Sequence, residues 1–510
     1  MTANATTAAS TIRVHDPADG SIVAEVPDNP PADVAAAISQ IRATQPAWEA
    51  LGPGGRASWL LRYGNWLRAH QTELSALLQS ETGKPWQEAT FEIPLALDAL
   101  GYCARNAAHF LADEHPKPHG ILTAAKKLTV TRRPYPVVGV ICPWNFPLLI
   151  TLVDALPALT AGAAVAVKPS ELTPLATQRA IEGWREIGAP DVLACVTGAA
   201  ATGAALVDEV DFVQFTGSTA TGRAVAGRAA QRLIPCSLEL GGKDAAIVLA
   251  DADLDRAVNG VVWGSLFNSG QACVAIERVY VEAPIHDEFA RRVAKKVAAL
   301  RQGKDGQDYH ADVGALASAA QLRIVEGQVR DAVAKGARIL TGGRRTREGG
   351  TFFEPTVLID VDHSMNIMRE ETFGPTIPIM RVADADEAIR LANQSPYGLS
   401  ATVWTRDRAR GRRIARAIEA GSVNINDTFT NLFTFGVPHS GWKQSGLGAR
   451  LGGPNCMQKY CRTQAITETR IAPKSEPLWY PYTARKGRLV SAILGIARVV
   501  DRRPRLHRNH

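Results

Sequence analysis

The sequence predicts an α/β protein with a doubly wound parallel sheet and a second α/β domain after it. Short Val- and Ala-rich segments alternate with helix-length segments between residues 137 and 249, and a weaker alternation runs from 279 to about 425. Parallel strands need a crossover connection, so this alternation indicates parallel sheets. The chain has 510 residues, more than one hydrophobic core can organise, and its 46% hydrophobic and 21% charged content is ordinary for a globular protein.

The part before the first sheet is predicted to start with strands and continue as helices. Residues 11–27 read as a strand pair around the turn Asp16-Pro17-Ala18-Asp19-Gly20. From 31 to about 112 the pattern is helical, because apolar residues recur every three or four positions. We interpret the aromatic members of this repeat as core rather than as a ligand box. The clearest stretch of the repeat is Trp59, Leu60, Tyr63, Trp66 and Leu67. Residues 128–131 and 136–140 are predicted to be extended.

The first alternation supplies the strands of the predicted doubly wound sheet. Five strands are predicted, at 137–141, 163–167, 192–196, 211–215 and 245–249. The helix-length segments between them include 175–186 and 219–231. No internal repeat occurs at any fixed period.

The second alternation predicts the second α/β domain. Its strands are predicted at 279–281, 352–358, 376–381, 401–404 and 422–425. Its helices are predicted at 285–300, 319–335, 385–393 and 407–419. Residues 434–448 contain five Gly or Pro and are predicted to form a loop.

A carboxylate and a thiol lie 34 residues apart between the two alternations: Glu239 in Leu-Glu-Leu-Gly-Gly-Lys and Cys273 in Gly-Gln-Ala-Cys. A cysteine nucleophile needs a base-assisted thiol, and a later hydrolytic step needs a general base. Taken alone the pair proves little, because a lone Cys is usually a buried apolar residue and a lone Glu is usually solvated or ion-paired.

Two motifs follow predicted strands, where ligands of open α/β sheets bind. Phe-Thr-Gly-Ser at 215–218, with Gly222 in the next turn, would let backbone approach a phosphate at a helix N-terminus. Its spacing matches neither G-x-G-x-x-G nor a P-loop, so a plain tight turn is an equal alternative. Lys-Pro-Ser-Glu at 168–171 offers a Lys and a Glu to a ribose diol, or else forms a solvated ion pair.

Two further loops carry polar side chains. In Pro-Trp-Asn-Phe-Pro at 143–147, Asn145 is either a rigid oxyanion donor or the cap of the next helix. In Glu-Glu-Thr-Phe-Gly-Pro at 370–375, the two acids on their own indicate a solvated pair.

These six motifs, in this order, resemble the aldehyde dehydrogenase superfamily of NAD(P)-dependent, non-acylating enzymes, and the resemblance covers about residues 11–470. It implies a Rossmann-type cofactor domain, an α/β catalytic domain and a small β oligomerisation flap. On this chain the cofactor domain would comprise 1–112 and 136–240, and the catalytic domain 241–446. The oligomerisation segments would be 113–135 and 447–473, followed by a basic tail at 474–510.

The resemblance also implies a mechanism. Cys273 would attack the aldehyde carbon to give a thiohemiacetal, with the oxyanion held by the Asn145 amide and the Cys273 N–H. One such donor is typically worth about 2.7–4 kcal/mol of barrier. Hydride transfer would leave a thioester, which a water activated by Glu239 would hydrolyse.

Nine positions would bind the cofactor by the same resemblance. Thr216, Gly217 and Ser218 would face nicotinamide and pyrophosphate, with Trp144 and Leu240 beside them. Glu371 and Phe373 would hold the nicotinamide ribose, and Lys168 and Glu171 the adenine-side ribose. A carboxylate at Glu171 accepts a 2′-hydroxyl and repels a 2′-phosphate, which favours NAD over NADP, although Lys168 allows some use of NADP.

The substrate funnel implied by the resemblance contains Ile150, Val153, Phe433 and His439. Some members acting on carboxylated aldehydes carry Arg where this chain has Val153, so an apolar or aromatic aldehyde is favoured over succinate semialdehyde. His439 either packs its ring or contacts a polar substrate group. A semialdehyde dehydrogenase, a CoA-acylating relative and a catalytically silent relative are the alternatives. Glu239 argues against acylation to CoA, and the presence of Cys273 and Asn145 with it argues against a silent relative.

The seven cysteines form no C-x-x-C pair and no framework, which indicates a reducing compartment and no metal site. The N-terminus has no signal-peptide pattern, and no run of about 18 apolar residues exists, so we expect a cytoplasmic protein. The resemblance implies a homodimer or homotetramer, joined by strand addition through 113–135 and 460–473.

The formal net charge of +7 belongs to residues 474–510, where nine Lys or Arg face two acids (nine minus two is seven), so the rest of the chain is neutral and no nucleic-acid partner is expected. A helix is predicted from about 486 to 503. Its apolar face would comprise Leu489, Ile493, Ile496 and Val500, with arginines on the other side. This pattern is typical of a helix at a membrane surface or on a partner subunit, and a helix folded back on its own subunit stays open.

Overall fold

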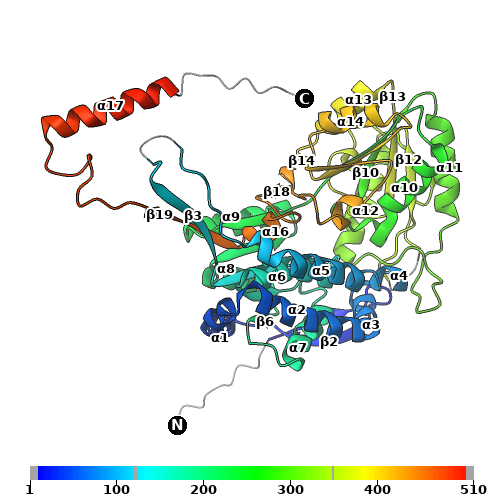
Figure 1. Ribbon diagram of the computed structural model, residues 1–510. Coiled ribbons are helices and arrows are strands. Elements are labelled where there is room, and N and C mark those ends of the chain that lie inside the picture. Colours follow the sequence, from blue (N-terminus) through cyan, green and yellow to red (C-terminus); the bar gives the residue numbers. More distant parts are fainter. Residues whose placement is uncertain (1–9, 120–122, 347–349, 501–510) are drawn as a thin grey trace, which may run out of the picture. The chain divides into compact units, whose positions relative to one another are not determined.

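The computed structural model describes residues 10–119, 123–346 and 350–500 (Figure 1). The chain divides into two compact units, one of Met1–Phe110 with Pro134–Tyr460 and one of Leu111–Arg133 with Cys461–His510. The larger unit holds two mixed, mainly parallel sheets with helices around them, so the predicted α/β class is confirmed.

The first sheet has six strands in the order β18-β8-β7-β4-β5-β6. Its strands are β4 (Val137–Ile141), β5 (Ala164–Lys168), β6 (Leu193–Cys195), β7 (Phe212–Thr216), β8 (Cys236–Glu239) and β18 (Gly446–Leu447). All pairs are parallel except β18 with β8. The chain runs outward from β4 through β5 and β6, then returns to the other side of β4 as β7. That reversal is a topological switch point, where open α/β sheets bind ligands at the carboxyl ends of the strands.

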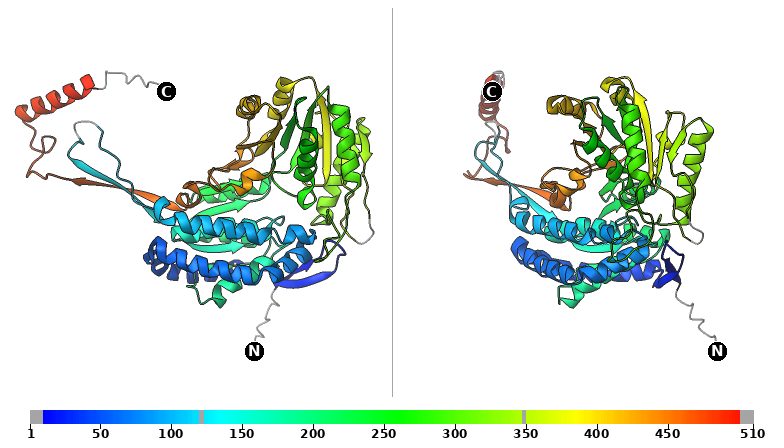
Figure 2. Two further views of the ribbon diagram at one scale, coloured as in Figure 1. Left: turned by 45° about the vertical axis from the view of Figure 1, so that its right-hand side comes forward. Right: turned by 90° about the vertical axis from the view of Figure 1, so that its right-hand side faces the viewer.

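Each connection between consecutive parallel strands of this sheet contains a helix, and a layer of N-terminal helices lies beside these crossover helices (Figure 2). The crossover helices are α6 (Pro147–Ala161), α7 (Leu175–Glu186), α8 (Ala200–Glu209) and α9 (Thr219–Gln231). The N-terminal helices are α1 (Pro31–Ala50), α2 (Gly52–Ala69), α3 (Gln71–Thr82), α4 (Trp86–Ala89) and α5 (Glu92–Phe110). Leu60, Tyr63, Trp66 and Leu67 of the predicted repeat are buried, as expected. The N-terminal helices are preceded by the antiparallel pair β1 (Thr11–His15) and β2 (Ile22–Pro27), also as expected.

The second sheet has seven strands in the order β11-β12-β13-β10-β9-β15-β16, parallel except for β11 with β12. Its strands are β9 (Asp244–Val248), β10 (Ile276–Glu282), β11 (Arg338–Thr341), β12 (Thr356–Ile359), β13 (Thr376–Val382), β15 (Ser400–Trp404) and β16 (Ser422–Ile425). Alternate residues of β9 belong to two different apolar clusters, Ala245 and Ile247 to one, Ala246 and Val248 to the other. The sheet is therefore covered on both faces, as parallel sheets generally are.

The helices of the second sheet are α10 (Leu254–Leu266), α11 (His286–Ala298), α12 (Ala319–Ala334), α13 (Ala385–Asn393) and α14 (Arg408–Ala417). Short elements complete the unit: α15 (Thr430–Phe433), α16 (Asn455–Gln458), β14 (Tyr397–Gly398), β17 (Trp442–Lys443) and the 3₁₀ turns η1 (Phe267–Gly270) and η2 (Asn366–Met368).

Three sequence-based assignments need correction. The segment 245–249, predicted as the last strand of the first sheet, belongs to β9, an interior strand of the second sheet between β10 and β15, because sequence alternation does not show where one sheet ends. The missing first-sheet strand is β8, whose four residues are too short to show a pattern. The predicted loop 434–448 contains β17 and β18, and β18 extends the first sheet beside β8.

The smaller unit contains a hydrogen-bonded strand pair and a helix. The pair is β3 (Lys126–Pro134) with β19 (Cys461–Thr469), and the helix is α17 (Ala484–Val500). The extended segment 128–131 is confirmed within β3, whereas 136–140 belongs to β4 of the first sheet. The tail helix is confirmed to Val500; residues 501–503 of its predicted span lie outside the described residues, as do the side chains of Ile496 and Val500.

Candidate active site

Cys273 lies between η1 and β10, directly after a strained turn that belongs to η1. Asn268, Ser269 and Gly270 have consecutive positive φ angles of 53°, 57° and 74°. A Cβ on Gly270 would lie 2.1 Å from the Gly374 carbonyl oxygen, so only glycine fits there. Strain of this kind persists where the surroundings enforce it, which is typical of functional sites.

Buried side chains hold this turn. The Asn268 N–H donates to Glu88 Oε1 at 3.0 Å, and Ser269 Oγ donates to the Gly314 carbonyl at 3.0 Å. The Gln271 side chain donates to the Asn268 carbonyl and accepts from the Ala317 N–H at 2.8 Å. Burial raises the pKa of Glu88 to about 8. Sequence reasoning found none of these partners, because each one is far from the turn or has no motif of its own.

The thiol of Cys273 donates to Glu239 Oε1 at 3.3 Å. Glu239 ends β8 of the first sheet and is almost fully buried, whereas Cys273 precedes β10 of the second sheet. Burial, reinforced by the charges of Asp244 and Glu371, raises the pKa of Cys273 to about 12. The resting group is therefore the neutral thiol, and a base in contact with it is what nucleophilic chemistry requires.

Asn145 reaches the same place from the loop after β4. Its Nδ2 donates to the Gln271 carbonyl at 2.9 Å, and its own carbonyl accepts from Lys84 Nζ at 2.8 Å. Lys84 forms a buried ion pair with Glu92 at 2.6 Å, and Glu92 also accepts from the Leu149 N–H at 2.9 Å. Helix α6 has no side-chain cap, so the alternative that Asn145 caps it is wrong.

Arg450 and Asp154 complete the surroundings of Glu239, and neither was predicted. The Arg450 guanidinium forms an ion pair with Glu239 and a second one with Asp154 of α6, Nη2 to Oδ2 at 3.3 Å. All three side chains are buried. The segment around Arg450 has no recognisable spacing, so only the tertiary structure reveals the cluster.

His439 is not in the predicted substrate funnel. It is buried, its Nδ1 bonds to Ser422 Oγ at 3.1 Å, and its Nε2 lies 3.7 Å from Glu239 Oε1. Burial lowers the pKa of His439 to about 4, so the ring is neutral near pH 7. Its ring is packed beside Glu239.

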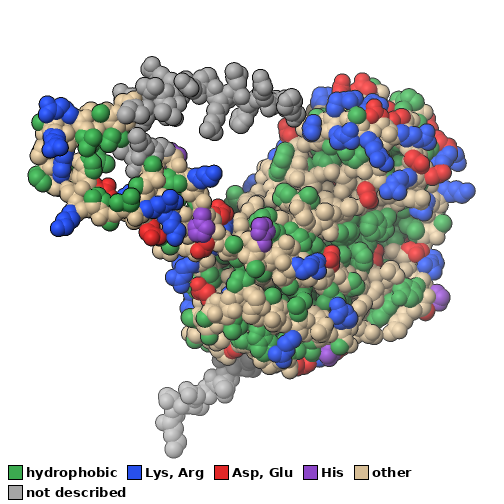
Figure 3. Space-filling model, in the orientation of Figure 1, with side chains coloured by type: hydrophobic (Ala, Val, Ile, Leu, Met, Phe, Trp, Pro, Cys, Tyr) green, Lys and Arg blue, Asp and Glu red, His purple; other side chains and the backbone are tan. Residues whose placement is uncertain are grey.

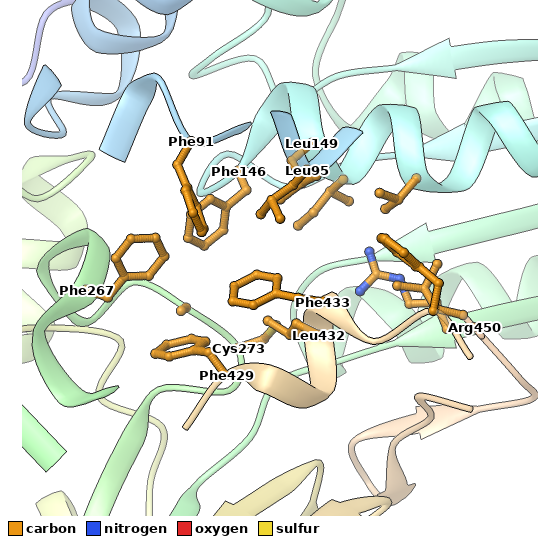
Figure 4. A pocket seen from close by; sticks show the side chains of 15 residues that line it. Phe91, Leu95, Phe146, Leu149, Phe267, Cys273, Phe429, Leu432, Phe433 and Arg450 are labelled. Carbon is orange, nitrogen blue, oxygen red and sulfur yellow. The ribbon is translucent and has the colours of Figure 1, made fainter. Parts of the chain in front are cut away.

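A cavity opens on one side of Cys273 (Figure 4). Ile150, Val153 and Phe433 line it as expected. The rest of its wall is mostly aromatic and aliphatic: Phe91, Leu95, Phe146, Leu149, Phe267, Ala272, Phe429, Leu432, Phe435 and Leu451. Arg450 is the one charged residue in this lining, which lies entirely within the described residues.

A second cavity lies on the other side of Cys273, at the switch point between β4 and β7. Cys273 and Ile150 line both cavities, so the thiol stands where they meet. Seven of the nine predicted cofactor residues line the second cavity: Trp144, Thr216, Gly217, Ser218, Leu240, Glu371 and Phe373. Lys168 and Glu171 do not. Lys168 is the last residue of β5 and Glu171 follows in the next loop, where Lys168 Nζ and Glu171 Oε2 are 3.5 Å apart and the Glu171 side chain is 46% exposed.

The second cavity suits a dinucleotide. The N-terminus of α9 lies at its wall, with Ser218 Oγ accepting from the Thr221 N–H at 3.2 Å, and such a terminus favours a pyrophosphate. Thr216 Oγ1, on the same wall, is buried without a partner among the described residues. Both observations fit a bound polar ligand.

Glu371 is fixed by a buried framework rather than solvated, so the solvated-pair alternative is wrong for it. Its Oε1 accepts from the Gly242 N–H at 3.0 Å, and burial with the nearby Glu277 charge raises its pKa to about 8. Glu277 pairs with buried Lys243 at 2.6 Å and accepts from the Thr372 and Phe373 N–H groups, each at 2.8 Å.

Comparison with known proteins then decides the family. The model of the aldehyde dehydrogenase family matches residues 4–466. The chain belongs to the aldehyde dehydrogenase family. It is an NAD(P)-dependent enzyme that oxidises an aldehyde, and the family resemblance seen in the six motifs is confirmed.

Relatives of this aldehyde dehydrogenase carry different substrate names. A Mycobacterium tuberculosis protein named for NADP(+)-dependent succinate-semialdehyde dehydrogenase activity is 38% identical over 490 residues, 95% of this chain and 93% of its own. The 4,4'-diapolycopene aldehyde oxidase of a Methylomonas species is 39% identical over 478 residues, 93% and 89% of the two chains. Lactaldehyde dehydrogenase of Escherichia coli has a similar structure, with a TM-score of 0.87 and 34% identity over 91% of this chain and 96% of that one.

Proposed function

We propose that this enzyme oxidises an apolar or aromatic aldehyde to its carboxylic acid with NAD, using Cys273 as nucleophile and Glu239 as base. The observation that carries the proposal is the position of Cys273. Its thiol touches Glu239 and stands between an apolar cavity and a polar cavity at the switch point. Substrate and cofactor would therefore meet at the sulfur.

The contacts support a role for each group. Glu239 takes the thiol proton along the 3.3 Å hydrogen bond as Cys273 attacks the aldehyde carbon. An amide nitrogen carries two hydrogens, and the contact of Asn145 with the Gln271 carbonyl uses one. The second, together with the Cys273 N–H, would hold the oxyanion of the thiohemiacetal. The residues of the second cavity would hold NAD as the hydride acceptor, and Cys273 would then carry the acyl group as a thioester.

After passing the thiol proton to solvent, Glu239 would be a carboxylate again and would activate the water that releases the acid. A carboxylate within reach of the sulfur supports hydrolysis over transfer to CoA. Trp144, Thr216, Gly217, Ser218, Leu240, Glu371 and Phe373 would hold the cofactor in the second cavity. Lys168 and Glu171, one strand further along, would hold its adenine-side ribose, where the Glu171 carboxylate favours NAD over NADP.

The domain roles follow from this arrangement. The first sheet and its helices, 1–112 and 136–240, would bind the cofactor, and 241–446 would supply the nucleophile. Residues 113–135 and 460–473, which contain β3 and β19, would join subunits into a homo-oligomer by strand addition, as the exposed residues of β19 allow.

The apolar substrate is supported by the lining of the first cavity. Its single cation, Arg450, already pairs with Glu239 and Asp154, so it is not available to a substrate carboxylate. A buried carboxylate without a partner is unfavourable. The Methylomonas relative is named for 4,4'-diapolycopene aldehyde, whereas the Mycobacterium relative is named for succinate semialdehyde. The cavity of this chain favours the former kind of substrate.

A substrate panel tests the proposal. We expect kcat/KM with NAD for decanal and benzaldehyde to exceed that for succinate semialdehyde at least about 100-fold, since an unpaired carboxylate in such a cavity costs several kcal/mol. Reduced-cofactor absorbance gives the rates, and Cys273→Ala is the blank. Equal or faster oxidation of succinate semialdehyde would refute the substrate class, and activity of the Cys273→Ala variant would refute the mechanism.

A further inference from the structure

The C-terminal segment of the smaller unit carries an exposed aromatic and apolar surface. Trp479, Tyr480 and Tyr482 are 56%, 78% and 71% exposed, and Leu489 and Leu494 of α17 are exposed as well. The family model matches the chain only to residue 466. This surface lies beyond the part of the chain that the family model matches, so its occupant has to be sought outside the active site.

Helix α17 is amphipathic. At 100° per residue, Leu489, Ile493 and Leu494 fall on one side of the helix, and Arg488 and Ser491 on the other. Figure 3 shows apolar and basic side chains gathered on the segment that ends in α17. Lys486 Nζ turns back to the Trp479 carbonyl at 2.9 Å, which ties the aromatic stretch to the start of the helix.

The net charge of this segment indicates what binds to it. Residues 474–510 hold nine Lys or Arg and two acids, and the remaining 473 residues are neutral overall. A second copy of the neutral body offers no net negative surface to this segment, whereas an anionic bilayer does. Basic residues are attracted to such a surface, and Trp and Tyr favour the headgroup region. We propose that residues 474–510 bind the surface of an anionic membrane, with α17 lying in the interface.

The membrane contact would be peripheral. No helix in the described part of the chain is long and apolar enough to cross a bilayer. Binding should therefore be reversible and should weaken as salt screens the basic residues. It would also place the apolar cavity of the proposed enzyme near membrane-dissolved aldehydes, although the membrane contact itself does not depend on that function.

Co-sedimentation of the full-length enzyme with vesicles tests this inference. We expect binding to phosphatidylcholine vesicles that contain phosphatidylserine, little binding to phosphatidylcholine alone, and release at high salt. Truncation after residue 473 should abolish binding and keep turnover of soluble benzaldehyde. Arg485→Glu with Arg488→Glu should lower the partition coefficient at least about 25-fold, since each basic residue near the surface contributes about fivefold. Ile493→Asn should weaken binding without changing its dependence on salt, because the net charge of the segment stays the same.

Two results would overturn the membrane contact. One is equal sedimentation of the full-length and truncated enzymes. The other is absence of binding at low salt together with a smaller oligomer after truncation, measured by light scattering, which would assign α17 to a neighbouring subunit.

A second, independent observation concerns Arg450, and it rests on the proposed role of Glu239. The groups that face Glu239 are Cys273, His439 and Arg450, and Asp154 lies behind Arg450. His439 is neutral near pH 7, so one guanidinium stands between two buried acids. Without it, the carboxyl groups of Glu239 and Asp154 would lie buried with no cation between them, which is unfavourable.

The geometry points to Arg450, held by Asp154, as the positioning residue that keeps Glu239 ionised and turned toward the sulfur. Arg450 would not itself touch the reacting atoms. Lys459 also lies near Asp154 and Arg450, with its Nζ donating to Gln214 Oε1 at 2.7 Å. Since burial lowers the pKa of Lys459 to about 7, it is the group whose titration could imitate an effect of Arg450.

The pH profile of kcat/KM separates positioning from a structural role. Arg450→Met should move the acid limb to higher pH by at least about one unit, because two neighbouring acids then share one proton. Arg450→Lys should keep the acid limb near its original pH. The double variant Arg450→Met with Asp154→Asn should return the acid limb most of the way to its original pH, because one of the two acids is removed. Lys459→Met, as the matched control, should leave the limb in place.

A uniform loss of rate in Arg450→Met with an unmoved acid limb, in an enzyme with an unchanged melting temperature, would contradict the inference. Full turnover by Glu239→Gln would instead contradict the proposed function, so the two failures are distinguishable.

Discussion

Burial keeps the thiol of Cys273 neutral, and a neighbouring residue supplies the base that a neutral thiol needs in order to react. Desolvation and the Asp244 and Glu371 charges raise its pKa to about 12, and Glu239 accepts its proton at 3.3 Å. A thiol in its neutral form is protected from oxidation and from reaction with other electrophiles, because the thiolate is the reactive form.

This burial predicts how Cys273 reacts with a simple reagent. At pH 7 only about one molecule in 10⁵ would carry the thiolate, and the fraction rises tenfold per pH unit until the pKa is reached. We expect the rate of iodoacetamide labelling of Cys273 to rise about tenfold per unit between pH 7 and 10. Peptide mass spectrometry measures the site, and Cys273→Ala provides the blank. A plateau below pH 9 would show that the pKa is not raised.

At the scale of elements, the loops after β4, β5 and β7 are brought to one edge of the first sheet by parallel pairing. The loop after β4 carries Asn145 and is anchored by the buried Lys84–Glu92 pair, so an N-terminal segment holds a residue of the candidate site in place. The loop after β5 is different, since Glu171 is half exposed and its partner Lys168 is 3.5 Å away.

That exposure lets the Glu171 side chain be replaced without disturbing the core. We expect the enzyme to prefer NAD in kcat/KM, and Glu171→Ser to narrow the preference at least about tenfold, because the carboxylate no longer repels a 2′-phosphate. Lys168→Met should lower the use of NADP more than that of NAD. Steady-state kinetics with both cofactors measures the ratio. Equal or better use of NADP by the unmutated enzyme would count against this role of Glu171.

At the scale of the whole molecule, the smaller unit presents β19 with a mostly exposed burial pattern. An exposed strand edge is a template for pairing with another chain. The family resemblance implies that this segment contacts another subunit.

Interrupting the edge should reduce the oligomer. We expect Ile466→Pro to lower the mass measured by light scattering, because proline removes a backbone donor from the strand. Ile466 is 47% exposed, so Ile466→Thr, which keeps a β-branched side chain, is the matched control and should leave the mass unchanged. The same mass for both variants would exclude strand addition through β19.

Local patterns were sufficient for much of the fold. Helices α7, α9 and α13 begin and end at the predicted residues, and β16 does too, because strong apolar periodicity and turn residues mark their limits. Prediction failed where the pattern was short or ambiguous. Strand β8 has four residues, and β9 has the same apolar composition as the strands of the first sheet although it belongs to the second.

The sequence by itself placed Glu239, Cys273 and Asn145, the residues that we propose carry the chemistry, in motifs that can be read locally. Only the tertiary structure decided their surroundings. The ion pairs of Arg450 join residues from β8, α6 and a late loop. The tertiary structure also places the His439 ring beside Glu239, a contact that the sequence did not indicate. The reason is physical: a motif is fixed by neighbouring residues, whereas burial and charge at a site depend on segments that meet only when two sheets close on each other.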